Sequence, residues 1–270
     1  MIEKSEKEVT YLFDLDGTLI LGDEKTPYAA ELIDFLNQRQ REFFIITNGC
    51  ALSPGAIWEK LKNMNIKVKR ENIITTAEVM ADILSTKYKD DGIFVAGAKW
   101  LKDYLADLGF RLVRRDPGAV VVSYDKNTSF ADIEDCIRFI QGGADYLSTN
   151  DDLFIPGMGH IYPHTGMINT AIESIVRRKP IIAGKPSLHF LKRIQQRAQG
   201  KERRFCVVGD SLATDITFAW NCGVTSYLVL TGVTGIDDII RSHVKMPDKV
   251  FADLRGLLEL EKSQCPGRYQ

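Results

Sequence analysis

The sequence has no excess of charge of either sign and no long apolar run. Its 270 residues include 35 basic and 36 acidic ones, so the formal net charge is −1. No basic patch stands out, and we expect no nucleic-acid partner. No apolar segment approaches the ~20 residues that cross a bilayer. The charged start MIEKSEKEV also lacks the apolar region of a secretory signal, so we expect no membrane partner.

Paired cysteines, internal repeats and low-complexity linkers are also missing. The five cysteines are odd in number and include no CxxC pair, which fits reduced thiols better than a disulfide framework. We therefore expect a cytoplasmic protein. Because no linker is visible, composition alone gives no domain boundary. The cysteines are Cys50, Cys136, Cys206, Cys222 and Cys265.

What the chain does contain is a regular alternation of apolar runs and amphipathic stretches. EFFIITN and GAVVVSYD are typical of strands, and KWLKDYLADLG is typical of a helix. This alternation predicts an α/β fold with parallel sheets and helices on both faces. The strands are almost continuously apolar, as expected for sheets buried on both sides.

Local signals predict where three helices begin. Thr26 is expected to cap one helix with Pro27 at its first position, and Ser53 with Pro54 repeats the pattern. Thr75 and Glu78 have the spacing of a capping box. Four residues within helical patterns are expected to pack in the interior: Trp58, Trp100, Trp220 and His189.

Four strand ends concentrate polar residues: FDLDGT at 13–18, ITN at 46–48, AGKP at 183–186 and VVGDSLATD at 207–215. Ligands bind at the carboxyl ends of strands in an open parallel sheet. If all four strands belong to one sheet, their polar residues surround one crevice. The clustered carboxylates would then need a cation, and an all-oxygen set suits Mg²⁺. The residues are Asp14, Asp16, Thr47, Asn48, Lys185, Asp210 and Asp215.

The pair Asp14-Leu-Asp16-Gly17 has two simpler interpretations when taken alone. One is a solvated Asp/Gly turn after a strand. The other is a calcium-binding loop, but an EF-hand has its glycine at position six and a glutamate at position twelve. Counted from Asp14, the glycine is fourth and the twelfth residue is Lys25, so the calcium loop fails on spacing.

Taken in order, FDLDGT, the Thr47 strand end, Lys185 and GDSLATD resemble the four motifs of haloacid dehalogenase-type phosphatases. An extra αβ series lies between the second and third motifs, as in the NagD-like members of that family. LSTNDDLFIP and YPHTGMINTAIE also resemble the return of their cap to the core. The resemblance implies a Rossmann-like core of residues 1–83 and 179–270 and an inserted α/β cap of residues 84–178. It further implies that a homodimer would form through the cap.

The same resemblance implies a role for each motif residue. Asp14 matches a nucleophile that becomes an aspartyl-phosphate, and Asp16 matches the general acid and base. Thr47 matches the hydroxyl that holds a phosphoryl oxygen, with Asn48 orienting the same group. Gly17 would let backbone N–H groups approach the phosphate.

The resemblance implies that the remaining motif residues neutralise negative charge or bind the metal. Lys185 matches the cation that offsets charge on the nucleophile and the phosphoryl group, and Pro186 disfavours helical geometry at Lys185. Asp210 matches a direct Mg²⁺ ligand, together with Asp14 and the backbone carbonyl of Asp16. Asp215 is expected behind the metal, holding a metal-bound water or Lys185.

The function implied is Mg²⁺-dependent hydrolysis of a small phosphate monoester, with nucleotide, sugar and other metabolite phosphates all compatible. The alternatives are a phosphotransferase or mutase that uses the same intermediate, a non-catalytic phosphate-binding module, and a phospho-receiver domain, which would be far shorter. Gly49-Cys50 departs from the family pattern, and the cap stretch Thr149-Asn150-Asp151-Asp152 stands where the family often has Thr-Asn-Pro-Asp. A role for Cys50 in redox sensing or for His164 in substrate contact is left open.

Overall fold

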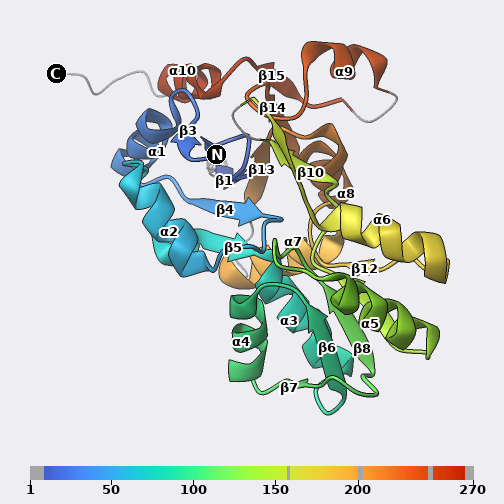
Figure 1. The fold of residues 1–270 in the computed structure, drawn as a ribbon. Coiled ribbons are helices and arrows are strands. Elements are labelled where there is room, and N and C mark those ends of the chain that lie inside the picture. The colour runs from blue at the N-terminus through green and yellow to red at the C-terminus, as the bar shows by residue number, and fades with distance from the viewer. Residues whose placement is uncertain (1–8, 157–158, 200–202, 243–245, 265–270) are drawn as a thin grey trace.

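The computed structural model describes residues 9–156, 159–199, 203–242 and 246–264, and it contains two parallel sheets with helices on both faces of each (Figure 1). The larger sheet has six strands in the order β15-β14-β13-β1-β4-β5. Its strands are β1 (Val9–Phe13), β4 (Phe43–Thr47), β5 (Ile73–Thr75), β13 (Arg204–Gly209), β14 (Thr225–Val229) and β15 (Lys249–Phe251). We call this sheet with its helices the core.

The second sheet has five parallel strands in the order β12-β9-β8-β6-β7. They are β6 (Gly92–Ala96), β7 (Arg111–Leu112), β8 (Ala119–Val122), β9 (Asp145–Ser148) and β12 (Ile181–Ile182). We call this sheet and the elements inserted around it the cap. The boundaries between core and cap, placed after residues 83 and 178 from the sequence, remain a prediction.

The helices follow the strands along the chain, as the alternating pattern predicts. In the core they are α1 (Ala29–Gln38), α2 (Pro54–Asn63), the 3₁₀ turn η1 (Arg70–Asn72), α3 (Thr76–Lys87), α7 (Leu188–Arg197), the π-helical turn η2 (Leu212–Ile216), α8 (Thr217–Cys222), α9 (Ile236–Arg241) and α10 (Leu254–Ser263). In the cap they are α4 (Lys99–Asp107), α5 (Phe130–Gln141) and α6 (Thr165–Val176). No helix within the described ranges is long and apolar enough to cross a membrane.

Two short antiparallel hairpins complete the fold, and the sequence patterns predicted neither. One joins β2 (Ile20–Leu21) to β3 (Glu24–Lys25), directly after the DxDGT stretch. The other joins β10 (Phe154–Pro156) to β11 (Ile161–Pro163). In Figure 1, β10 extends from the cap toward the carboxyl ends of β1 and β13.

Apolar packing joins the two sheets. One face of the core sheet packs against α1, α2 and α10. The other face packs against α3, α7 and α8, and this apolar cluster continues without a break into α4 and one face of the cap sheet. The opposite face of the cap sheet packs against α5 and α6. The central strands β1, β4, β6 and β8 are almost wholly buried, as the sequence predicts.

Two of the three predicted helix starts are wrong in detail. Helix α1 begins at Ala29 after Tyr28, which adopts φ 65°. Thr26 is instead buried, and its hydroxyl donates to the carbonyl of Thr18 over 2.5 Å. Thr75 does precede α3, but its side chain makes no capping hydrogen bond. The prediction for Ser53 is confirmed, because its hydroxyl accepts from Ala56 N over 3.2 Å.

The sequence left open whether all four motif strands belong to one sheet, and they do not. Strand β12 pairs in parallel with β9 in the cap sheet, with Ile181 opposite Leu147. The chain then continues this pairing without forming a strand, because Gly184 N donates to the carbonyl of Thr149 over 2.8 Å. The third motif therefore reaches the core from the neighbouring sheet, although residues 179–270 were predicted to belong to the core.

Candidate active site

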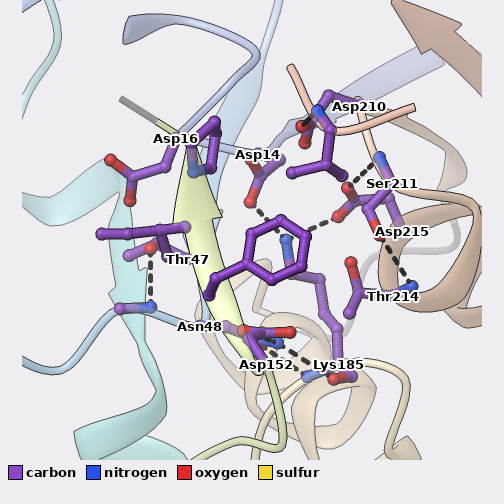
Figure 2. Close-up of a pocket in the computed structure, with 15 residues that line it drawn as sticks. Asp14, Asp16, Thr47, Asn48, Asp152, Lys185, Asp210, Ser211, Thr214 and Asp215 are labelled. Atoms are coloured by element: carbon purple, nitrogen blue, oxygen red, sulfur yellow. Dashed lines mark hydrogen bonds and ion pairs between the residues drawn. The ribbon is translucent and has the colours of Figure 1, made fainter. Parts of the chain in front are cut away.

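Three adjacent strands of the core sheet deliver most of the predicted site (Figure 2). Asp14 follows β1, Thr47 ends β4, and Asp210 follows β13. Because parallel strands end at the same edge, these side chains meet in one small cavity that all three line. The geometry confirms that the carboxyl edge of the core sheet gathers these residues.

Lys185 lies at the centre of this cavity and is only 2% exposed. Its Nζ lies 2.6 Å from Asp14 Oδ1 and 2.7 Å from Asp215 Oδ1, and it donates to the carbonyl of Ile46 over 3.0 Å. All three donors of the ammonium are used, so the group is fixed in place. Burial alone would lower the pKa of Lys185, but the charges of Asp14 and Asp215 outweigh burial and raise it.

Three buried carboxylates surround this single cation. Oxygens of Asp14, Asp210 and Asp215 all lie within 4.8 Å of one another. Burial raises the pKa of Asp14 well above its ordinary value, and Lys185 opposes that shift. Burial and the charge of Asp215 raise the pKa of Asp210 to about 7. Three acids against one lysine leave a negative, all-oxygen cluster, which suits a hard divalent cation.

Gly17 is required by the close approach of Asp210. It adopts φ +91°, and a Cβ at this position would lie 2.3 Å from Asp210 Oδ2. The N–H of Gly17 donates to the carbonyl of Ile20 over 2.6 Å. That N–H is therefore used within the loop, and the expectation that Gly17 lets neighbouring backbone N–H groups approach a phosphate stays a prediction.

Asp16 lies on the other side of the cavity from Lys185, next to Thr47 (Figure 2). Its half-buried carboxyl has a raised pKa because of burial, which the charges of Lys60 and Lys185 oppose. The Thr47 hydroxyl accepts from Gly49 N over 2.9 Å and keeps its own proton to donate. Asp14 and Asp16 thus face one space from two sides.

Asn48 has a different position from the one expected. Its Oδ1 accepts from Lys185 N over 2.7 Å, and its Nδ2 donates to Lys185 O over 3.0 Å. The second Nδ2 proton points to Asp152 Oδ2 at 3.0 Å. The side-chain amide is fully used in these contacts, so it positions the backbone of Lys185. Gly184 makes this possible, because a Cβ there would lie 2.6 Å from Asn48 Oδ1.

Asp152 is the main site residue that the sequence patterns missed. It follows β9, lines the cavity and accepts the Asn48 hydrogen bond described above. Burial raises its pKa to about 6, and the Asn48 hydrogen bond works against that shift. The signal for it was its place at the end of the Thr149-Asn150-Asp151-Asp152 stretch, where it matches the last residue of the family's Thr-Asn-Pro-Asp but was given no role. Seven further residues line the cavity: Phe154, Ile155 and Pro156 of β10, Ser211 and Thr214 after β13, and Gly49 and Val233.

Comparison with known proteins agrees with this geometry. A family model described as "Haloacid dehalogenase-like hydrolase" matches residues 11–111, and one described as "HAD-hyrolase-like" matches residues 182–257. A relative named acid sugar phosphatase from Staphylococcus epidermidis is 30% identical over 255 residues, 93% of this chain and 98% of the relative.

Solved structures lead to the same family. The 4-nitrophenylphosphatase of Thermotoga maritima matches with a TM-score of 0.85 at 31% identity, over 93% of this chain and 96% of that one. The glycerol phosphate phosphatase of Mycobacterium tuberculosis, crystallised with magnesium, matches with a TM-score of 0.85 at 28% identity, over 93% of this chain and 77% of that one.

The chain belongs to the haloacid dehalogenase-like hydrolases. Within that family it is a NagD-like phosphatase, an enzyme that hydrolyses phosphate monoesters. The resemblance carried by the four motifs is thereby confirmed. So is the fold class, a Rossmann-like parallel core with a smaller inserted α/β unit.

Two residues left open by the sequence lie beside the active site of this phosphatase without lining it. Burial raises the pKa of the Cys50 thiol to about 11, so the thiol stays protonated and poorly reactive. His164 is buried, stacks on Tyr124 with ring centroids 4.9 Å apart and places Nδ1 3.1 Å from Asn150 Oδ1. Burial lowers its pKa to about 4, so the ring is neutral near pH 7.

Two packing predictions fail in this phosphatase. Trp220 is 56% exposed, and His189 on α7 is also exposed, although both were expected inside. Helical spacing alone did not reveal that they lie on outward faces. Trp58 and Trp100 are half-buried, and each indole N–H donates to a backbone carbonyl, of Val68 and Cys50 respectively.

Proposed function

We propose that the phosphatase hydrolyses small phosphate monoesters with Mg²⁺ through an aspartyl-phosphate on Asp14. The observation that carries the proposal is the position of Asp14. Its Oδ1 lies 2.6 Å from the Lys185 ammonium, and its carboxylate belongs to the three-acid cluster. A fixed cation beside a carboxylate favours its ionised form, the form that a nucleophile needs, and here it opposes the burial that raises the pKa of Asp14.

The donor set fits a magnesium ion. We assign the ion to Asp14, Asp210 and the backbone carbonyl of Asp16, and we assign Asp215 to the support of Lys185, which it contacts at 2.7 Å. When bound, the ion supplies positive charge that offsets the phosphoryl oxygens and the clustered carboxylates. The glycerol phosphate phosphatase crystallised with magnesium supports this choice of metal.

The side chains divide the work of the reaction. An Asp14 oxygen attacks phosphorus and displaces the alkoxide, which takes a proton from Asp16. A water then gives a proton back to Asp16 and attacks the same phosphorus, which frees phosphate and restores the Asp14 carboxylate. Thr47 donates its hydroxyl proton to a phosphoryl oxygen, and Lys185 stabilises the negative charge that moves between Asp14 and phosphate.

The substrate is proposed to be a small metabolite phosphate, such as a sugar or polyol phosphate. The names of the relatives, acid sugar phosphatase and glycerol phosphate phosphatase, support this class. The cavity agrees, because its volume of about 70 Å³ beneath Phe154, Ile155 and Pro156 leaves room for little beyond the phosphoryl group. The proposal also keeps from the sequence a cytoplasmic location and a homodimer formed through the cap.

The test is a screen of the purified enzyme against a panel of metabolite phosphates with Mg²⁺, scored by released phosphate. For the best substrate, acid quenching with ³²P-labelled ester should trap a protein-bound label that hydroxylamine removes, as expected of an acyl phosphate. Asp14→Asn should trap no label. Turnover without any trapped label in rapid-quench experiments would remove the covalent step, and transfer of phosphate to added sugars instead of water would favour a phosphotransferase.

A further inference from the structure

Acidic side chains outnumber basic ones around the active-site cavity. Among the described residues that line it, the cation is Lys185, and the acids are Asp14, Asp16, Asp152, Asp210 and Asp215. The three protons of the lysine ammonium are taken by Asp14, Asp215 and the carbonyl of Ile46. Lys185 supplies one positive charge and a divalent ion would supply two, so two carboxylates lack a counter-charge when all five are ionised. The lining therefore has no cation to spare for a second anionic group on a substrate.

The surroundings of the cavity do not make up for this shortage of positive charge. The segment that forms the roof and its return, FIPGMGHIYP at 154–163, contains no lysine or arginine. Lys60 lies near enough to oppose the raised pKa of Asp16. Its Nζ is paired with Asp23 Oδ1 at 3.0 Å, however, and Lys60 is not among the residues that line the cavity. The charge around a bound ester is therefore set mainly by the lining carboxylates, Lys185 and the metal.

Asp152 is the lining carboxylate that the proposed chemistry does not use (Figure 2). The other four are assigned above to attack, proton transfer, the metal and the support of Lys185. Asp152 Oδ2 accepts from Asn48 Nδ2 over 3.0 Å, and no described lysine or arginine forms an ion pair with this carboxylate. The side chain is partly exposed at the cavity wall. Burial raises its pKa to about 6, so the carboxyl is ionised at pH 8.

We propose that the phosphatase selects substrates by the charge of the alcohol that leaves, and that Asp152 is a specificity-determining residue. This inference rests on the proposed hydrolysis at Asp14. The cavity of about 70 Å³ holds little more than the phosphoryl group, so a charged group on a short ester stays close to the lining acids. A carboxylate or second phosphate there is repelled, whereas a hydroxyl is tolerated and an ammonium is attracted. The substrate class is therefore esters of neutral or amino alcohols, and esters of hydroxy acids are rejected.

Charge selection is tested with short esters that differ at one position. Phosphoglycolate carries a carboxylate, phosphoglycolamide carries an uncharged amide of the same shape, and phosphoethanolamine carries an ammonium. With Mg²⁺ at pH 8, we expect kcat/KM for phosphoglycolate to be at least about tenfold below that for phosphoglycolamide, because like charges repel at this range. Phosphoethanolamine should equal or exceed the amide. Equal kcat/KM for phosphoglycolate and phosphoglycolamide would overturn the inference.

The residue test is Asp152→Asn, which removes the charge and keeps an oxygen that can accept the hydrogen bond of Asn48. The preference for phosphoglycolamide over phosphoglycolate should fall about threefold or more. A merely structural disturbance would slow both esters alike and leave this ratio unchanged. Asp151→Asn is the matched control, because Asp151 is exposed, accepts from Asn169 Nδ2 and does not line the cavity. The control should keep the ratio within about twofold, and an unchanged ratio in Asp152→Asn would refute the role of Asp152.

A binding measurement separates this inference from the proposed hydrolysis. Calorimetric titration of Asp14→Asn enzyme with Mg²⁺ needs no turnover, and phosphoglycolamide should bind at least about tenfold more tightly than phosphoglycolate. If the wild type hydrolyses no ester but the affinities differ in this way, the hydrolysis fails and charge selection stands. Equal affinities in an enzyme that does hydrolyse esters would refute charge selection alone. Saturable binding of neither ester would refute both.

Discussion

The core and the cap have the same architecture but carry different residues at the carboxyl ends of their strands. Both are parallel sheets with buried apolar strands, and in both the carboxyl edge faces the same junction. At the core edge stand three clustered carboxylates, and Lys185, which follows β12 of the cap sheet, reaches into that cluster. At the ends of β8 and β9 in the cap stand small neutral groups that bond to one another, as when Ser148 Oγ donates to the carbonyl of Asn150 over 2.9 Å and Thr149 Oγ1 donates to Ser123 Oγ over 3.2 Å. The architecture therefore supplies a place for chemistry, and the residues at the strand ends decide whether any occurs.

The largest expected effect is confined to the core. Asp14→Asn should lower kcat by at least about 10⁴-fold, as loss of a nucleophile does in other enzymes. The protein should stay folded, because an amide of equal size replaces the carboxylate. Phosphate release and a urea unfolding curve check both points, with the exposed Asp237→Asn on α9 as control. Wild-type turnover in Asp14→Asn would exclude Asp14 as the nucleophile.

Metal removal should also act on the core alone. Exhaustive treatment with a chelator should lower activity by about 10³-fold or more, since the three-acid cluster then lacks its counter-charge. Added Mg²⁺ should restore it. Circular dichroism before and after should be the same, because cap and core are held by apolar packing. A chelated enzyme with full activity would refute the metal assignment.

Lys185→Gln should affect both regions at once. It removes the cation shared by Asp14 and Asp215, and removal of one partner from a buried ion pair costs about 3–5 kcal/mol of unfolding free energy. We expect a lower urea midpoint together with about 10²-fold or greater loss of kcat. Lys192→Gln on the exposed face of α7 is the matched control. An unchanged urea midpoint would mean that Lys185 does not hold the acids together.

Asp152→Asn should give a smaller effect that depends on pH. Burial raises the pKa of Asp152 to about 6 in the fold, above its unfolded value near 3.8. The folded state thus binds the extra proton between these values, so stability due to this group is present below pH 3.8 and is lost as pH rises through 6. The wild type loses this stability on going from pH 4 to pH 7 and the variant does not. The unfolding free energy of the variant, relative to that of the wild type, should therefore rise by roughly 1–2 kcal/mol between pH 4 and pH 7.

Urea unfolding at both pH values measures this difference, with the exposed Asp90→Asn as control. The same relative stability at pH 4 and pH 7 would show that Asp152 is not a buried acid. This variant also tests the contact between the two regions, because Asp152 of the cap accepts a hydrogen bond from the side-chain amide of Asn48 in the core.

The smallest expected effect comes from the cap roof. Phe154→Ala on β10 should change KM for the best substrate about two- to tenfold with a smaller change in kcat, because Phe154 lines the cavity with an apolar ring that carries no charge and no proton for the reaction. Phe130→Ala, 90% exposed on α5, should change neither. A loss of kcat as large as that of Asp14→Asn would contradict the division of roles between core and cap.

The sequence predicted the parts of the site that depend on local pattern. Asp14, Thr47 and Asp210 stand at the ends of strongly apolar strands, so their placement follows from strand recognition alone. Lys185 was found by its motif, but the sheet that delivers it was not, because a two-residue strand such as β12 carries no periodicity. The role of Asn48 and the presence of Asp152 depend on contacts between segments about 100 residues apart, which single-sequence patterns do not encode.

Helix starts show the same limit at short range. Thr26-Pro27 carries every local signal of an N-terminus, yet its hydroxyl bonds to the Thr18 carbonyl and the helix begins later. Thr75 and Glu78 have the right spacing, yet Arg197 from α7 takes the Glu78 carboxylate. In both cases a tertiary partner displaced the local one.

Strand β12 has a consequence for how this protein could be shortened or recombined. Because Lys185 follows a strand that is hydrogen-bonded to β9, deleting the inserted unit would also remove the support of a catalytic-site lysine. Ala183 N donates to Ser148 O and Gly184 N donates to Thr149 O. Backbone hydrogen bonds therefore join residues 181–184 to the end of β9, up to the residue before Lys185. The inserted cap therefore cannot be removed without disturbing the position of Lys185. A chimera that exchanges it must carry β9 and residues 181–185 as one piece.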